Sequence, residues 1–543
     1  MGKLETSTLD LVERLLEIGT ALTAEKDTPR LLEMILLGAK EITHADGGTL
    51  YRVSADHQNL EFAIIRTDSL EIAMGGTSGN DITFPDLPLH RDDGTPNTNM
   101  VAACAALERV TINIPDAYEN TTYDFSGTRK FDESTGYRSQ SFLTVPMANH
   151  ENEVIGVLQL LNKIDPASGA VVPFSAEDQR LVESLASQAA VSLTNQQLIA
   201  NLRELFESFI EMIASAIDDK SPYTGGHCRR VPELSMMLAE ACARTRNGPL
   251  RDFDMSPSDR YELRIASWLH DCGKVTTPEY VVDKATKLET IYDRVHTVDT
   301  RFEVLKRDAE IEQLKARLAA LEAGEEPDLE ALETVYEARL AQLDDDRGFV
   351  RKHNVGGEFM RDEDKQRTRA IAAYRWVGTD GEEQPFLTDN EVYNLSIERG
   401  TLTAEERDVI NYHITATIKM LESLPFPKEL QRVPEFAGGH HEKMDGTGYP
   451  RGLKRDDMSL QARIMGIADI FEALTAADRP YKKAKTLSES LKIMGFMKKD
   501  NHIDPDLFDV FLQEKVWLEY ANSFLLPEQI DEVDLTQIPG YAG

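Results

Sequence analysis

Two short stretches of this sequence bring together histidines and carboxylates of the kind that hold catalytic metal ions. Residues 440–450 read His-His-Glu-Lys-Met-Asp-Gly-Thr-Gly-Tyr-Pro, and residues 270–274 read His-Asp-Cys-Gly-Lys. Adjacent positions on a helix diverge by about 100°, so a His-Asp pair can serve two ions or bridge them through the carboxylate. The two stretches together therefore predict a hydrolytic site with more than one metal ion.

A further carboxylate stands in an unusual place. Residues 464–474 form an almost wholly apolar helical run, and Asp469 lies inside it. A charge buried there is costly unless it is paired or bound to a metal. Asp469 is therefore a candidate metal ligand, and a buried salt bridge is the alternative.

Composition limits the class of protein. The chain has 543 residues, which suits two to four domains, and a net charge of −35, which argues against binding a nucleic acid polymer or an anionic membrane. Its four cysteines include no CxxC pair, which favours the reducing cytoplasm. No apolar run approaches the 18 residues typical of a membrane span.

The N-terminal third has the pattern of a small α+β domain. Apolar periodicity predicts helix over 8–44, and β-branched runs predict strands at 48–53, 60–65, 141–147 and 154–161. Such elements describe an antiparallel sheet with flanking helices. We expect this domain to occupy residues 1–197.

Four motifs in this region resemble a GAF domain: residues 113–118, 135–139, 145–147 and 162–163. The likeness is strongest to the regulatory GAF domains of cyclic-nucleotide phosphodiesterases, whose Asn-Lys…Phe…Asp-Glu pattern falls here on Asn162, Lys163, Phe174 and Asp178. Gln179 stands where that pattern has its final Glu. The resemblance implies a sensor with a small cyclic nucleotide as ligand. A GAF fold used only for dimerisation, or for another ligand, is the alternative.

Helical segments join and interrupt the domains. An apolar stripe over 175–219 favours a connecting helix at 198–219 that pairs with its twin in a homodimer, although the helix could instead pack on its own domain. Leucine spacing around a Gly-Pro break predicts a helical hairpin at 300–345, with Asp328 as N-cap, inside an insertion of about 288–400. Residues 521–543 are expected to form a C-terminal tail.

The C-terminal half resembles the HD-GYP family of phosphodiesterases, a branch of the HD metal-dependent phosphohydrolases. The resemblance covers residues 220–287 and 401–485 and implies an all-α domain over 220–520. It rests on the order of the motifs around His227, His270-Asp271, His413, His440-His441, Gly448-Tyr449-Pro450, Asp469 and Arg479-Pro480-Tyr481-Lys482. By the same resemblance the metal ligands are His227, His270, Asp271, His413, His440, His441 and Asp469. Asp271 would bridge two divalent ions, iron or manganese.

The family also implies a reaction. A water shared by the two ions attacks phosphorus, and Lys274 contacts the scissile phosphate or assists the leaving oxygen; a surface lysine is the alternative. Gly448, Tyr449 and Pro450 would form a rim for the substrate, while Arg479 and Lys482 would hold its second phosphate. The implied substrate is cyclic di-GMP, which is opened to pGpG, and hydrolysis of pGpG to GMP is a further step that the family allows. Cyclic GMP-AMP is the related alternative.

Three departures from the family pattern bear on this hypothesis. Tyr223 stands where members with a third ion carry a glutamate, so we expect two ions. Asp271 and His413 are 142 residues apart, and His353 lies between them as an alternative ligand, but the sequence around His413 matches the family. The loop before Arg479 is one residue longer than usual.

Two other functions remain open from the sequence. The domain could be a metal-binding signalling or interaction module that docks partners on the hairpin. It could also be a phosphohydrolase of mononucleotides or alarmones, although the Gly-Tyr-Pro turn favours the cyclic dinucleotide. The leading hypothesis is a bacterial cytoplasmic signalling enzyme in which a GAF sensor regulates a cyclic-dinucleotide phosphodiesterase.

Overall fold

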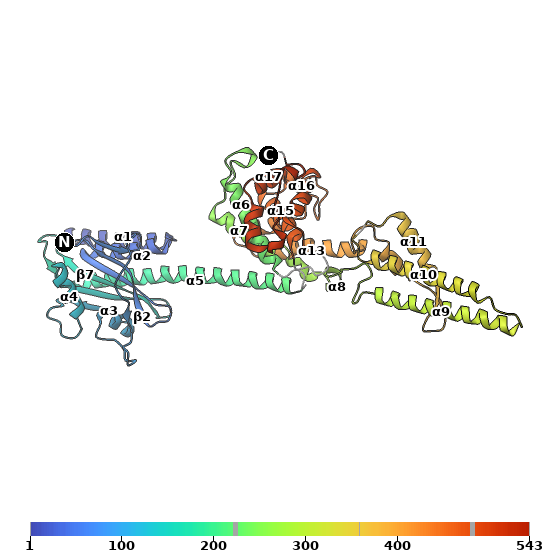
Figure 1. Ribbon diagram of the computed structural model, residues 1–543. Helices are drawn as coiled ribbons and strands as arrows, with labels where there is room; N and C mark the ends of the chain where they lie inside the picture. Colours follow the sequence, from blue (N-terminus) through green and yellow to red (C-terminus); the bar gives the residue numbers. More distant parts are fainter. Residues whose placement is uncertain (1, 221–225, 358, 478–483, 542–543) are drawn as a thin grey trace. The chain divides into compact units, whose positions relative to one another are not determined.

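The computed structural model describes residues 2–220, 226–357, 359–477 and 484–541 (Figure 1). The chain divides into two compact units, Met1–Leu205 and Phe206–Gly543, each with its own hydrophobic core. Within the described residues, none of the helices combines the length and apolar character that crossing a bilayer requires.

The first unit is built on an antiparallel sheet in which β3, β2, β1, β7, β6 and β5 lie side by side in that order. Its strands are β1 Ala45–Val53, β2 Asn59–Thr67, β3 Ile72–Gly75, β4 Leu87–Pro88, β5 Ile112–Ile114, β6 Phe142–Ala148, β7 Val154–Ile164 and β8 Val171–Val172. Successive side chains of a strand point to opposite faces, so Leu158 and Leu160 enter one core and Val157 enters another. The predicted antiparallel sheet is confirmed.

Helices cover both faces of this sheet. They are α1 Gly2–Ala24, α2 Thr28–Thr43, α3 Val101–Glu108 and α4 Ser126–Thr135. Leu31 and Ile35 of α2 are buried with Leu158 on one face, whereas the small residues of α3 pack with Val157 on the other. The α+β fold predicted for this part of the chain is therefore confirmed.

A single 45-residue helix, α5 (Ala176–Lys220), runs from the first unit into the second. The boundary expected between residues 197 and 198 falls inside this helix and marks no break in it. Near its start, Ala186, Ala189 and Ala190 are buried in the first unit. The connecting helix is therefore continuous with the last helix of the first unit.

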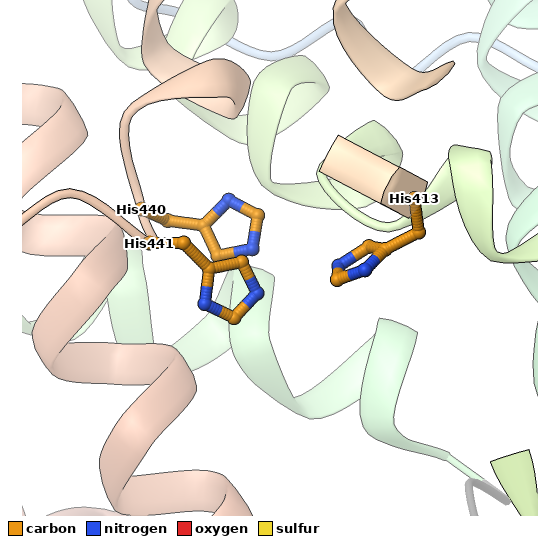
Figure 2. A group of neighbouring side chains, drawn as sticks. All are labelled: His413, His440 and His441. Atoms are coloured by element: carbon orange, nitrogen blue, oxygen red, sulfur yellow. The ribbon is translucent and has the colours of Figure 1, made fainter. Parts of the chain in front are cut away.

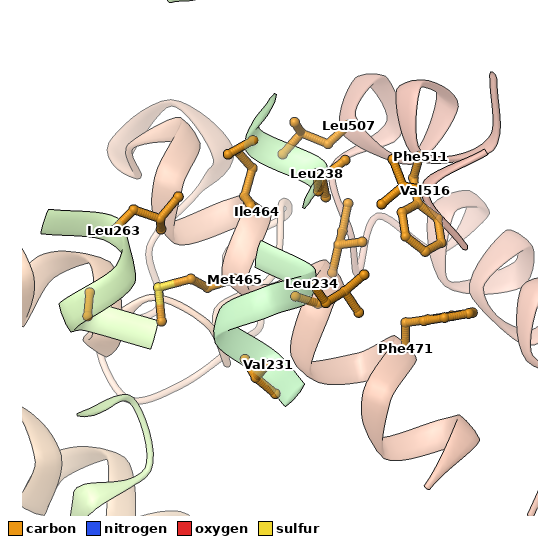
Figure 3. Close-up of a cluster of buried hydrophobic side chains, with 14 of the residues drawn as sticks. Val231, Leu234, Leu238, Leu263, Ile464, Met465, Phe471, Leu507, Phe511 and Val516 are labelled. Atoms are coloured by element: carbon orange, nitrogen blue, oxygen red, sulfur yellow. The ribbon is translucent and has the colours of Figure 1, made fainter. Parts of the chain in front are cut away.

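The second unit is a bundle of short helices. They are α6 His227–Arg244, α7 Pro257–Leu269, α8 Glu279–Val282, α13 Ala404–Glu422, α14 Val433–Gly438, α15 Leu460–Thr475, α16 Leu487–Lys499, α17 Pro505–Gln513 and α18 Val516–Phe524, with 3-10 turns η1 Gly248–Leu250, η2 Cys272–Thr276, η3 Lys428–Leu430 and η4 Arg455–Asp457. Figure 3 shows the core, where Leu234 and Leu238 of α6 lie among side chains of α15, α17 and α18. The predicted helical architecture is confirmed, and the two short strands of this unit lie in the insertion between α8 and α13.

The C-terminal segment belongs to this bundle. Helix α18 crosses the expected boundary at residue 520, and two turns follow it, η5 Pro527–Gln529 and η6 Leu535–Gln537. Ile538 is buried in the core, and Gln529 Nε2 donates to Thr475 O at 2.7 Å. These contacts show that the described part of 521–543 packs as part of the unit and does not form a separate tail.

The insertion between α8 and α13 is a module with a core of its own. It contains the predicted hairpin and more: α9 Val295–Glu322, α10 Leu329–Asn354, α11 Asp362–Ala372, β9 Arg375–Val377, β10 Glu383–Pro385 and α12 Asp389–Leu395. Asp328 caps α10 as predicted, since its carboxylate accepts from Ala331 N at 3.0 Å. Phe302 and Leu343 pack at the base of the hairpin with Phe386.

One close approach of backbones joins segments on either side of the insertion. A Cβ built on Gly273 of η2 would lie 1.9 Å from His413 O and 2.6 Å from Thr417 N, both in α13. The amide of Gly273 donates to Thr417 Oγ1 at 2.9 Å. Only a glycine therefore lets η2 lie against α13, which brings residues 270–274 next to His413.

We predict that Gly273→Ala lowers the free energy of unfolding of the second unit by about 1–3 kcal/mol or more, because there is no room for the added methyl group. All three tryptophans, Trp268, Trp376 and Trp517, lie in this unit, so their fluorescence during urea unfolding of the full chain reports on it alone.

The matched control is Gly348→Ala in α10, where an added Cβ meets nothing within 4 Å. This change should be neutral or stabilise by about 0.5–1 kcal/mol, because alanine favours a helix over glycine. Equal unfolding midpoints for the two variants would show that the approach of η2 to α13 is not tight.

Candidate metal centre

Five segments of the second unit deliver the predicted ligands to one place. His227 is the first residue of α6, His270 and Asp271 join α7 to η2, His413 lies in α13, His440 and His441 follow α14, and Asp469 lies in α15. All of these side chains are buried or nearly so. Sequence reasoning identified each of them, and the fold places them together.

Asp271 lies between the two halves of this cluster. Its Oδ2 is 3.2 Å from His227 Nε2 and 3.3 Å from His270 Nε2. Its Oδ1 is 3.3 Å from His413 Nε2 on the other side. One carboxylate therefore faces two sets of imidazoles, which is the arrangement that a bridging ligand needs.

Each half of the cluster has the ligand types that hold a divalent ion. His227, His270 and Asp271 offer ligand atoms within 4.8 Å of one another, and so do His413, His440 and His441. Figure 2 shows the three histidines of the second group converging from α13 and from the segment after α14. Asp469 adds a carboxylate to the first group, with Oδ1 3.3 Å from His227 Nε2.

Three of the histidines are oriented by the same backbone device. The Nδ1 atoms of His270, His413 and His440 lie 2.8, 2.5 and 2.6 Å from the carbonyl oxygens of Ser267, Ile410 and Ala437, each three residues earlier. A carbonyl can only accept, so Nδ1 carries the proton. In the neutral ring this leaves the Nε2 lone pair for a metal, as in most protein metal sites.

His227 is oriented instead by a residue that sequence reasoning missed. Its Nδ1 lies 2.5 Å from Glu472 Oε2, and Arg230 Nε donates to the other oxygen at 2.7 Å. Glu472 is only 1% exposed. It stands in the same apolar stretch as Asp469, so the argument from burial that identified Asp469 could have identified Glu472 as well.

Electrostatics divides the histidines into two kinds. Burial lowers the pKa of His227, but Glu472, Asp271 and Asp469 outweigh it and raise the pKa well above its usual range. Burial likewise opposes the charged form of His270, yet Asp271 and Asp469 raise its pKa to about 9. These two rings carry protons that a bound cation would replace.

The other pair is neutral. Burial, with the nearby rings of His441 and His270, lowers the pKa of His440 well below its usual range. Burial also lowers the pKa of His441 to about 4. At neutral pH both rings therefore present uncharged nitrogens, the form in which histidine binds a metal.

Three buried polar atoms at this site have no hydrogen-bond partner among the described residues. They are Asp271 Oδ1, His413 Nε2 and His440 Nε2. Buried polar atoms are normally satisfied, so a group of orphans pointing into one cluster calls for a missing partner. Imidazole nitrogens and carboxylate oxygens together form a ligand set that suits a divalent transition metal. These residues therefore fit such an ion.

Lys274 and the Gly-Tyr-Pro turn lie at the edge of the cluster. Lys274 Nζ is 2.5 Å from Asp271 Oδ2 and is 28% exposed. The ring of Tyr449 stacks on His441, with centroids 4.9 Å apart. A Cβ on Gly448 would lie 2.4 Å from Lys443 N, so the turn folds back closely on the segment that follows the histidine pair.

Glu442 holds this turn in place and was not assigned a role from the sequence. Its carboxylate is buried and accepts from Arg451 N at 2.7 Å and from Leu453 N at 3.0 Å. The turn containing Gly448, Tyr449 and Pro450 is thus tied to the residue next to His441.

The remaining predicted residues lie elsewhere. Tyr223, Arg479 and Lys482 fall outside the described residues. His353 lies in the insertion, where its Nδ1 contacts Phe349 O at 2.9 Å, so the structure does not bring it to the metal cluster.

The residues predicted to bind a ligand in the GAF domain make contacts with other residues of the same domain. Asn162 Oδ1 accepts from Gln140 N at 2.7 Å, and Lys163 Nζ lies 2.5 Å from Asp178 Oδ2. Phe174 is buried in the core. The Lys163–Asp178 pair joins β7 to the start of α5, and a ligand-binding role for the four residues stays a prediction.

We predict that Glu472→Gln weakens Mn²⁺ binding by roughly 10- to 100-fold, because the partner that orients a ligand histidine usually contributes this much. Glutamine keeps the size of the side chain but removes the charge that faces His227. Isothermal titration of metal-free full-length protein measures the effect.

Glu262→Gln is the matched control. Glu262 is also buried, at 2% exposure, and accepts from Arg432 N at 2.6 Å and Arg432 Nε at 2.9 Å. It lies outside the histidine cluster, so its loss should lower stability without changing Mn²⁺ affinity. Equal effects of the two variants on affinity would mean that Glu472 has no special link to the metal.

Curated proteins related to this chain carry phosphodiesterase names. A 351-residue match covers 63% of the chain and 48% of the 3'3'-cGAMP-specific phosphodiesterase 3 of Vibrio cholerae serotype O1, at 26% identity. A 137-residue match, 24% of the chain, is 35% identical to a probable cyclic di-GMP phosphodiesterase of the same organism and covers 31% of it. The chain thus spans less than half the length of each of these relatives.

Among solved structures, the GAF domain from an Acinetobacter phosphoenolpyruvate-protein phosphotransferase matches 35% of this chain and 97% of its own, at 14% identity and a TM-score of 0.26. Family models match two regions, a GAF domain at residues 27–193 and an HD domain at residues 389–507. The HD match includes His413, His440, His441 and Asp469. The chain therefore joins an N-terminal GAF domain to a helical unit that contains an HD domain.

Proposed function

We propose that the helical unit is a metal-dependent phosphodiesterase of the HD-GYP type that hydrolyses a cyclic dinucleotide and is regulated by the GAF domain. The observation that carries this proposal is the position of Asp271, whose two oxygens face two separate groups of histidines. Relatives named as phosphodiesterases of 3'3'-cGAMP and of cyclic di-GMP support it. We take cyclic di-GMP as the first candidate substrate and 3'3'-cGAMP as the second.

Two divalent ions, iron or manganese, would be held by the two groups of ligands, with Asp271 shared between them. When bound, such a pair supplies Lewis acidity and lowers the pKa of a water molecule towards neutrality. The described ligands include no thiolate, and a mixed set of imidazole and carboxylate suits these metals.

The chain's own residues would bind and orient the substrate. Lys274 Nζ is fixed beside Asp271 and partly exposed, so its ammonium can donate to a phosphoryl oxygen at the edge of the cluster. Tyr449, stacked on His441, offers the outer face of its ring to a base or ribose. Arg479 and Lys482 would hold the second phosphate. The expected first product is the linear dinucleotide pGpG, with GMP as a possible second.

We predict that the protein loaded with Mn²⁺ or Fe²⁺ hydrolyses cyclic di-GMP. Asp271→Asn should lower kcat by more than roughly 100-fold, the upper end of the loss seen when a residue that only orients a metal ligand is changed. Chelation should abolish activity and added metal should restore it. Chromatography of the products from cyclic di-GMP, 3'3'-cGAMP and pGpG measures both rate and preference.

The control is Asp346→Asn, which alters a buried carboxylate of the insertion that accepts from Tyr374 Oη at 2.6 Å. It should leave kcat unchanged. Metal binding without hydrolysis of any of these substrates would contradict the proposed activity. It would favour a signalling or interaction module.

We further propose that the chain forms a homodimer through α5. Exposed apolar residues recur along this helix with spacings of 7, 4, 3, 4 and 3: Val191, Leu198, Leu202, Leu205, Phe209 and Met212, each at least 46% exposed. This is the heptad pattern of a helix that pairs with another helix. Asn195 fills the vacant core position of the pattern, where an asparagine fixes the register of a parallel pair. A second copy of the chain is the partner that matches such a pattern.

We predict that light scattering gives the wild-type chain twice its mass of 60.9 kDa, and that the double variant Leu202→Glu, Leu205→Glu gives 60.9 kDa. The introduced carboxylates of the two copies would repel each other, and the buried leucine side chains would be lost. Ala200→Glu places the same charge on the opposite face of α5 and should leave the dimer intact. A monomeric wild type, or a dimer unaffected by the double variant, would refute pairing through this stripe.

A further inference from the structure

The last turns of α5 are built into the core of the helical unit. Ile210, Ala214 and Ile217 are buried there together with Cys228 and Val231 of α6. Their spacing of four and three residues places them on one face of the helix. The end of α5 is therefore fixed to the same packing that supports α6, the helix that begins with His227.

Asp218, the residue after Ile217 in α5, caps the N-terminus of the neighbouring helix α6. Its carboxylate accepts from Gly226 N at 3.0 Å and from Cys228 N at 3.2 Å. The N-cap of α6 is Gly226, which has no side chain to cap the helix itself. Asp218 is 5% exposed and takes the place of the missing cap. Since the two amides flank His227, Asp218 sets the position of this ligand.

Lys220, the final residue of α5, ties down a second ligand segment. Its Nζ donates to Lys274 O at 3.0 Å and to Val275 O at 2.5 Å. These carbonyls belong to η2, which begins directly after Asp271. The ammonium of Lys274 in turn lies 2.5 Å from Asp271 Oδ2. Lys220 therefore holds the turn that carries both Asp271 and Lys274.

We propose that Asp218 and Lys220 are positioning residues of the metal centre: the last turn of α5 fixes His227 and the Asp271–Lys274 turn relative to each other. His227 and His270 are 43 residues apart in the sequence. The segments that carry them are both bonded to the last turn of α5. Because α5 begins in the GAF unit, these ties also connect the sensor helix to the ligands. The inference rests on the metal-dependent activity proposed above.

The test compares Asp218→Ala and Lys220→Met with the wild type in the full chain, with two readouts. Isothermal titration gives Mn²⁺ affinity, and initial rates give kcat and KM for cyclic di-GMP. We expect Asp218→Ala to weaken Mn²⁺ binding and Lys220→Met to lower kcat with little change in KM, each by roughly 10-fold. Asp218→Asn and Lys220→Arg keep an acceptor and a donor, so they should recover most of the loss.

Two controls separate positioning from general stability. Thr486→Ala removes the N-cap of α16, where the Thr486 hydroxyl accepts from Glu489 N at 3.4 Å. Lys287→Met removes an ammonium group that donates to Leu395 O and Ile397 O in the insertion. Both should leave Mn²⁺ affinity and kcat unchanged.

The proposal is overturned if Asp218→Ala and Lys220→Met bind Mn²⁺ and turn over substrate like the wild type. It is also overturned if the conservative variants recover nothing while the controls lose as much. If the wild type binds Mn²⁺ but hydrolyses no cyclic dinucleotide, the proposed activity fails. The comparison of Mn²⁺ affinities between Asp218→Ala, Asp218→Asn and the wild type would still decide whether the last turn of α5 positions the ligands.

Discussion

The burial of the Asp271 carboxylate is the constraint on which the helical unit depends. This group is 1% exposed, and its pKa lies well below the usual range because Lys274, His270 and His227 outweigh the effect of burial. An unpaired charge in such a place costs several kcal/mol, so the surroundings must supply positive charge. Asp469 and Glu472 add two more carboxylates close by, and together they demand cations at the centre of the bundle.

The scaffold meets this demand by placing ligands at the ends of short helices. His227 begins α6, His270 follows α7 and His440 follows α14, so each comes from a point where the chain turns. Backbone carbonyls three residues earlier then fix the rings of His270, His413 and His440. Helix ends thus set the direction of His227, His270 and His440, whereas His413 and Asp469 project from within α13 and α15.

Much of this centre could be predicted from the sequence, because ligand types carry their own signal. Histidine pairs beside acids stand out, and Asp469 stands out because its neighbours are apolar. The same reasoning applied to Glu472, one helical turn later, would have found the partner of His227. The turn around Gly448 was also visible, although its attachment through Glu442 was not.

Other features depend on contacts that no local pattern encodes. The contact of Gly273 with Thr417 of α13 joins residues 144 positions apart across an insertion, and only the fold shows that a glycine is required. Asp218 was not singled out from the sequence, because its burial and its contacts with Gly226 N and Cys228 N depend on how the end of α5 lies against the start of α6. The antiparallel sheet of the GAF domain was predictable because its strands are β-branched and bounded by polar turns.

In the proposed centre, Asp271 would be shared by two metal ions. Anomalous diffraction at the manganese edge, from crystals of Mn²⁺-loaded protein, tests it directly. We expect two peaks per chain, one near His227 and His270 and one near His413, His440 and His441, both in contact with Asp271. A single peak, a third peak, or two peaks of which only one touches Asp271 would contradict it.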